Sequence, residues 1–176
     1  LILGDNIFYF PSLKNVITNS INNKGATIFA YHVSDPSRYG VVDFTPENKI
    51  ISIEEKPTCP KSNYAIPGFY FFDNQVIEYA KNIQPSDRGE LEITDVIKRY
   101  YQDKQLKVIK MDKGTAWLDT GTVGSLMEAS QFVHVLENRQ GLKVGCVEEQ
   151  AYLMNYINGK QLKKLAAQFN NGYGEY

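Results

Sequence analysis

Two aspartates lie where short apolar segments end. Asp5 follows the apolar residues 1–3, and Asp119 follows the apolar residues 116–118. A magnesium ion that is bound together with phosphates prefers oxygen ligands, usually one or two carboxylates, with water and phosphate completing an octahedron. Two aspartates on neighbouring strand ends would supply that carboxylate pair. Each aspartate taken alone also fits a turn or a helix N-cap, and the local sequence favours that simpler interpretation.

A second candidate group lies in the segment Glu54-Glu55-Lys56-Pro57. A lysine at the end of a strand can hold a phosphate as a point charge, and a carboxylate can accept hydrogen bonds from sugar hydroxyls. The alternative is a solvated strand end with a screened ion pair, which is the commoner fate of such charges. Gly40 precedes another apolar segment, where a glycine permits either the close approach of a ligand or a tight turn.

Two further side chains have both a structural and a binding interpretation. Arg88 lies near the start of an expected helix, where it meets an anion or pairs with Asp87 or Glu92. Trp117, the only tryptophan, either forms a wall of a sugar site or packs as a partly buried aromatic residue. From these residues alone, the sequence supports an α/β domain that binds an anionic sugar or a nucleotide.

Composition excludes several other classes of function. The 176 residues carry a net charge of −1, which argues against a nucleic-acid-binding surface, and no apolar segment approaches the roughly 18 residues of a membrane helix. The two cysteines, Cys59 and Cys146, form neither a disulfide framework nor a zinc-binding spacing, which fits a reducing cytoplasm. The sequence contains no Ser-His-Asp arrangement, no G-x-x-x-x-G-K-[ST] and no G-x-G-x-x-G.

Alternating hydrophobic patterns predict the elements that position these residues. We expect strands at 1–3, 26–33, 41–44, 50–54, 65–72, 106–111 and 116–118, helices at 12–22, 75–83 and 90–101, and further helices after 122. Gly4-Asp5-Asn6 is expected to form a turn after the first strand. The strands at 41–44 and 50–54 are expected to form an antiparallel hairpin. The alternation predicts an open, mostly parallel sheet with its ligand at the carboxyl ends of the strands. The shift to helices predicts two domains, 1–122 and 123–176.

Seven segments in order resemble one family, glucose-1-phosphate thymidylyltransferase. They are LGDN (3–6), DPSRYGVV (35–42), EEKP (54–57), SNYA (62–65), RGELEITD (88–95), AWLDTGT (116–122) and RQGLKV (139–144). The resemblance implies a Rossmann-like nucleotidyltransferase fold with a mixed sheet, a hairpin insertion and a C-terminal helical region. It also implies the condensation of dTTP with α-D-glucose 1-phosphate to dTDP-glucose and pyrophosphate, the first step of dTDP-L-rhamnose synthesis.

Matching positions imply roles for eight residues. As the resemblance assigns them, Mg²⁺ is bound by Asp5 and Asp119, the sugar phosphate by Lys56, the sugar hydroxyls by Glu55 and the sugar by the backbones of Gly40 and Ile66, while Arg88 and Trp117 line the site. The catalytic residues would then be Lys56, Asp5 and Asp119. Family members are tetrameric, and we expect a cytoplasmic homo-oligomer that binds neither nucleic acid nor membrane. Tyr9 to Leu13 and Lys113 depart from the family's regulatory pattern, so no feedback site is predicted.

The sequence differs from the family's pattern at its N-terminal end. Family members begin with a glycine-rich G-x-G-T-R-L loop and a thymine-binding segment, so we expect roughly the first hundred residues of such an enzyme to lie upstream of Leu1. The chain alone is therefore expected to be inactive. Two alternatives remain open: a non-catalytic sugar-phosphate-binding or oligomerisation module, and a nucleotidyltransferase that uses another nucleotide such as UTP.

Overall fold

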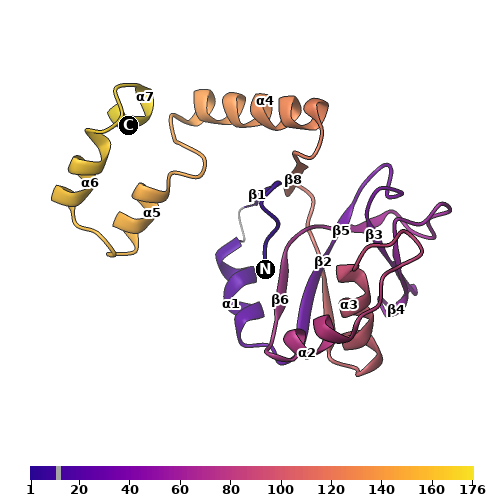
Figure 1. Cartoon of the computed structure of the whole chain (residues 1–176). Helices are drawn as coiled ribbons and strands as arrows, with labels where there is room; N and C mark the ends of the chain where they lie inside the picture. Colours follow the sequence, from indigo (N-terminus) through magenta and orange to yellow (C-terminus); the bar gives the residue numbers. More distant parts are fainter. Residues whose placement is uncertain (11–12) are drawn as a thin grey trace. The chain divides into compact units, whose positions relative to one another are not determined.

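The computed structural model describes residues 1–10 and 13–176 and divides the chain into two compact units. The first unit, Leu1–Thr120, contains all the strands of the described residues, and the second, Gly121–Tyr176, contains helices (Figure 1). Mixed α/β structure was predicted and is confirmed.

The first unit is built on a sheet with the strand order β4-β3-β5-β2-β6, to which β7 adds by pairing with β2. The strands are β2 (Ala26–His32), β3 (Gly40–Phe44), β4 (Ile50–Glu55), β5 (Tyr64–Ile66), β6 (Tyr70–Phe72) and β7 (Leu106–Lys110). Among the described residues, only the pair β2–β7 is parallel, and the other pairs are antiparallel. The prediction of a mostly parallel sheet was therefore wrong. Turns and short loops join several of these strands directly, whereas a parallel pair needs a long crossover.

The hairpin predicted at 41–44 and 50–54 is confirmed as β3 and β4. Its register places Gly40 opposite Glu55, and β5 on the other side of β3 places Ile66 opposite Gly40. The central strand of this group therefore brings three predicted site residues side by side.

The strand predicted at 65–72 is divided into β5 and β6 by Pro67 and Gly68. The two pieces pair with different parts of β2: β5 with Tyr31 and His32, and β6 with residues 26–28. Proline has no N–H to donate to a strand ladder, so the chain bends at this point and continues in a shifted register.

A second, two-stranded sheet brings the two ends of the first unit together. It pairs β1 (Asn6–Tyr9) with β8 (Ala116–Asp119), and Asn6 lies opposite Asp119. The predicted strand at 1–3 is reduced to a single bridge between Ile2 and Phe69, and the strand begins at Asn6, where a turn was expected. Because its partner lies more than a hundred residues further along the chain, no local pattern marks this strand.

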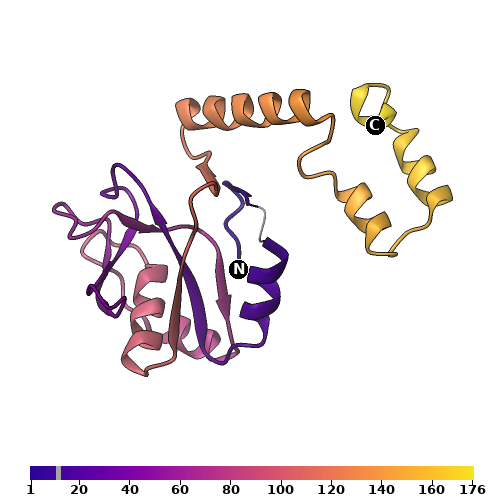
Figure 2. The same ribbon diagram turned by 180° about the vertical axis from the view of Figure 1, so that it is seen from behind.

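Helices cover both faces of β2. Ile28 packs in a cluster with Ile97 of α3 (Ile93–Gln102), while Phe29 packs in another cluster with Val16 of α1 (Leu13–Ile21). Side chains alternate along a strand, so consecutive residues of β2 face different helices. In both views α1 and α3 lie on opposite sides of β2 (Figures 1 and 2).

Helix boundaries follow the predictions with small shifts. Helix α2 (Gln75–Asn82) lies within the predicted range 75–83, and α3 begins three residues later than the predicted 90. Of the predicted helix at 12–22, residue 12 lies outside the described residues, and α1 covers 13–21.

The second unit consists of α4 (Val123–Gln140), α5 (Val147–Leu153), α6 (Gly159–Ala166) and α7 (Gly172–Glu175), as the helical pattern after 122 predicted. Thr122 and Asn158 begin α4 and α6 with capping boxes, in which side-chain oxygens satisfy otherwise unpaired backbone N–H groups. Over the described parts of the chain, we find no helix whose length and hydrophobicity would let it cross a membrane.

Candidate active site

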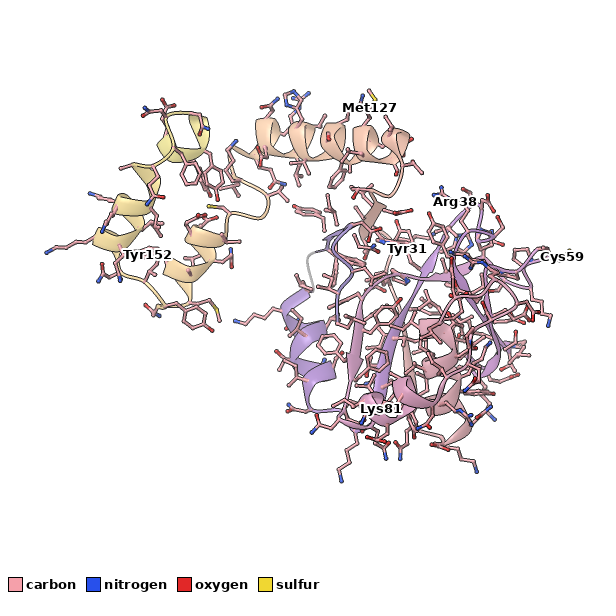
Figure 3. All side chains as sticks on the ribbon, in the orientation of Figure 1. Tyr31, Arg38, Cys59, Lys81, Met127 and Tyr152 are labelled. Carbon is pink, nitrogen blue, oxygen red and sulfur yellow. The ribbon has the colours of Figure 1, made fainter. Side chains whose placement is uncertain are left out.

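A cleft of about 530 Å³ lies in the first unit. Its lining residues come from segments far apart in the sequence: Leu3, Asp5, Asn6, Arg38, Tyr39, Gly40, Glu55, Lys56, Ile66, Gly68, Tyr70, Ile93, Thr94, Trp117 and Asp119. Seven of the eight predicted site residues are in this set, and only Arg88 is not. Figure 3 shows Tyr31 and Arg38 at one end of this unit and Lys81 at the other.

Gly40 has two polar side chains directly above its backbone. A Cβ atom at this position would lie 3.1 Å from Thr94 Oγ1 and 3.3 Å from Glu55 Oε2. These two groups are themselves bonded, because the buried Thr94 hydroxyl donates to Glu55 Oε2. Any larger residue at position 40 would therefore push against the Thr94–Glu55 pair, which explains the glycine and leaves its backbone open to the cleft.

Lys56 leaves the sheet immediately after Glu55, at the end of β4. Its backbone adopts a φ of +39°, in the left-handed region, and its N–H donates to the carbonyl oxygen of Tyr39 at 3.0 Å. The side chain is exposed at the edge of the cleft. In a regular strand, consecutive side chains point to opposite faces, so this break in the extended backbone lets Glu55 and Lys56 line the same cleft.

The two predicted metal ligands, Asp5 and Asp119, line the same cleft because β1 pairs with β8. The carbonyl oxygen of Asp5 accepts hydrogen bonds from Thr120 N at 2.8 Å and Thr120 Oγ1 at 2.9 Å, which holds it beside Asp119. The Arg38 guanidinium lies 3.6 Å from Asp119 Oδ2. Within the described ranges, no three His, Cys, Asp or Glu side chains gather closely enough to enclose a metal ion by themselves.

Tyr39 and Trp117 form an aromatic wall of the cleft, and Tyr31, which does not line the cleft, packs against Trp117. The Tyr31 ring meets the Trp117 ring edge-on at 5.6 Å between centroids, and the Tyr39 ring lies tilted at 4.9 Å. Burial raises the pKa of the Tyr39 hydroxyl, although the Arg38 charge opposes this shift. Burial, with a smaller effect of Glu55, raises the pKa of Tyr70 to about 12.

Arg88 is the one predicted site residue that the structure does not bring to the cleft. Its guanidinium pairs with Glu90 at 2.8 Å and with Glu92 at 3.4 Å. Glu92 was one of the two expected partners, whereas Glu90 was not expected and takes the place of Asp87. Conversely, several polar or aromatic residues that were not predicted as site residues do line the cleft: Asn6, Arg38, Tyr39, Tyr70 and Thr94. Four of them belong to the motifs already noted, so position within a motif was the available signal.

Comparison with known proteins places this fold and cleft in a family. The sequence profile of the family described as "Nucleotidyl transferase" matches residues 1–135. The chain belongs to the nucleotidyl transferase family. The match covers every residue that lines the cleft, together with most of α4.

Curated relatives of this nucleotidyl transferase chain carry a more specific name. A glucose-1-phosphate thymidylyltransferase of Mycobacterium tuberculosis is 51% identical over 100% of this chain and 62% of its own length. The enzyme of the same name from Neisseria meningitidis is 46% identical over the same shares. The chain thus spans about three fifths of the length of these relatives.

Solved structures agree with this family membership. A structure described as a glucose-1-phosphate thymidylyltransferase of Bacillus anthracis, in complex with sucrose, matches with a TM-score of 0.64 and 42% identity. It covers 74% of this chain and 52% of that one. A UDP-glucose pyrophosphorylase complexed with UDP-glucose matches with a TM-score of 0.65 over 76% of this chain and 54% of that one. At 23% identity, this second likeness shows the shared fold alone.

Proposed function

We propose that this chain carries the sugar-phosphate-binding part of a glucose-1-phosphate thymidylyltransferase. The observation that supports it most strongly is the cleft, which collects seven predicted site residues from positions 5 to 119. The names of the curated relatives, which match along the whole chain, support the same assignment. In the proposed reaction, dTTP and α-D-glucose 1-phosphate give dTDP-glucose and pyrophosphate.

The proposed chemistry is a displacement at phosphorus. A phosphate oxygen of glucose 1-phosphate attacks the α-phosphorus of dTTP. The bond between that phosphorus and the oxygen that bridges the α- and β-phosphates breaks, and pyrophosphate leaves. Such a step depends on positioning and on charge neutralisation. The Lys56 ammonium would hold the attacking phosphate. Glu55 would accept hydrogen bonds from sugar hydroxyls, beside the backbones of Gly40 and Ile66, which also line the cleft.

Asp5 and Asp119 fit a magnesium site that is shared with the substrates. Two carboxylates are what Mg²⁺ usually takes from a protein when phosphate oxygens and water complete its octahedron. When bound, the ion would neutralise negative charge on the phosphates. Arg38, already beside Asp119, would have to give up this ion pair or share the carboxylate.

The proposal predicts that the chain binds glucose 1-phosphate but does not turn over by itself. Its sequence contains the sugar-side motifs and no glycine-rich loop for nucleotide phosphates. Isothermal titration calorimetry with Mg²⁺ should show saturable binding of glucose 1-phosphate and none of glucose. Assays with dTTP and glucose 1-phosphate should release no pyrophosphate. No binding of the sugar phosphate would contradict the proposed site, and pyrophosphate release would contradict the need for a further segment.

We also propose that the chain self-associates through its second unit. Several large apolar side chains of this unit are well exposed: Val123, Leu126, Met127, Val135, Val147, Leu153, Met154 and Tyr156. Soluble monomers rarely leave so many such groups in water, so a partner copy is the expected cover. Size-exclusion chromatography with light scattering should give a mass above 20.0 kDa. A monomer at every tested concentration would contradict this proposal.

A further inference from the structure

Asn6 lies between the residues proposed to bind the metal and the sugar. It follows Asp5 in the chain and faces Asp119 across the β1–β8 pair. None of the interpretations above assigns it a role. Its side chain is half-buried, and its amide makes three hydrogen bonds to different parts of the cleft.

The amide oxygen of Asn6 accepts two of these bonds. The Trp117 indole donates through Nε1 at 2.6 Å, and the backbone N–H of Gly68 donates at 3.2 Å. The amide nitrogen donates the third bond, to Asp5 Oδ1 at 2.8 Å. This orientation of the amide is chemically determined, because an indole N–H and a backbone N–H can only donate, whereas an ionised carboxylate can only accept.

The two donors to Asn6 come from segments that have little freedom of their own. Gly68 lies in the break between β5 and β6, and its carbonyl oxygen accepts from Leu3 N at 2.8 Å. A Cβ at position 68 would lie 2.7 Å from the Leu3 side chain, so only glycine permits this approach. Asn6 is therefore tied to the rigid sheet on one side, while its other contacts reach the aromatic wall and the carboxylate.

We propose that Asn6 is a positioning residue that fixes the Asp5 carboxylate and the Trp117 indole relative to each other. Its effect on the metal site rests on the proposed function; its effect on Trp117 does not. By occupying Oδ1 of Asp5, the amide leaves the second carboxylate oxygen for an ion in the cleft. By accepting from Nε1, it sets the plane of the Trp117 ring. Hydrogen-bond partners of metal ligands commonly change metal affinity 10- to 100-fold when they are removed.

The experiment compares Asn6→Ala, Asn6→Asp and a control, Asn82→Ala. Asn82 also donates through its side-chain amide, to Glu78 O at 2.7 Å, but belongs to α2 and does not line the cleft. Because the chain has one tryptophan, its NMR spectrum contains a single indole N–H resonance. Mn²⁺, a paramagnetic substitute for Mg²⁺, gives the metal affinity through water-proton relaxation.

We expect Asn6→Ala to shift the indole N–H resonance upfield and to raise the dissociation constant of Mn²⁺ about tenfold. Asn6→Asp keeps an acceptor for Nε1, so it should return the indole resonance close to its wild-type position. Asn82→Ala should change neither measurement. Should Asn6→Ala fail to fold, the aspartate variant still lacks the amide N–H that donates to Asp5 Oδ1, so an unchanged Mn²⁺ affinity in this variant would contradict the role of that hydrogen bond.

Two results would overturn the positioning role. One is an indole resonance that does not move in Asn6→Ala, and the other is an unchanged Mn²⁺ affinity in a variant that has only become less stable. A wild-type chain that binds neither Mn²⁺ nor glucose 1-phosphate would instead contradict the proposed function. In that case the indole comparison would still test the Asn6–Trp117 contact on its own.

Discussion

Replacing Lys56 by alanine is expected to raise the dissociation constant of glucose 1-phosphate about thirtyfold. The ammonium group lies at the edge of the cleft, on the residue that follows Glu55. A hydrogen bond to a charged group contributes about 2 kcal/mol, which corresponds to roughly a factor of thirty in affinity. Isothermal titration calorimetry with Mg²⁺ measures the change directly. A loss of affinity smaller than threefold would exclude Lys56 as the main phosphate ligand.

Two companion variants separate charge from backbone conformation at this position. With φ at +39°, residue 56 adopts a backbone that glycine accepts more readily than alanine, so Lys56→Gly should be more stable than Lys56→Ala by about 1 kcal/mol. Both should bind the sugar phosphate equally weakly. Lys61→Ala removes a charge from the same region, where Lys61 pairs with Glu54 at 2.7 Å, outside the cleft. It should leave the affinity unchanged.

Most of the cleft could be predicted from the sequence because many of its lining residues lie within the recognised motifs. Glu55 and Lys56 were recognised from one four-residue segment, and the structure places both at the cleft. Arg88 was the exception: two nearby glutamates hold its guanidinium away from the cleft, and a motif alone does not show which partner a charge takes. Asn6 was read only as a turn residue. Its contacts with Trp117 and Gly68 join distant segments that no local pattern connects.

The elements were predicted better than their pairing. Strands β2, β3, β4 and β7 were located closely by alternation and apolar runs. The direction of each pair, however, depends on which strands become neighbours in the sheet, and that is decided by packing between distant segments. The pairing of β1 with β8 is the clearest case, since it brings Asp5 and Asp119 to one cleft and has no signal near either strand. Pro67 is a local signal for the break between β5 and β6, but the apolar segment around it led to the prediction of one continuous strand at 65–72.

Asp5→Asn and Asp119→Asn are each expected to raise the dissociation constant of Mn²⁺ at least tenfold. The double variant should raise it by much less than the product of the two single fold-changes. Both carboxylates line the same cleft: Asp119 ends β8, and Asp5 directly precedes β1, the strand that pairs with β8. If one ion binds both, removing either ligand disrupts the same site, so the second substitution has little left to remove. Independent effects would multiply instead. Water-proton relaxation on the two single variants and the double variant completes this cycle.

The amide substitutions keep the size of each side chain, which protects the comparison from unfolding. Asp119 does lose its ion pair with Arg38, but the Arg38 side chain is 53% exposed, so the cost in unfolding free energy should stay below about 1 kcal/mol. Asp87→Asn removes an exposed carboxylate that does not line the cleft, and it should bind Mn²⁺ as the wild type does. Strictly multiplicative effects of the two substitutions would show that the carboxylates do not share an ion. An unchanged affinity in either single variant would remove that aspartate from the metal site.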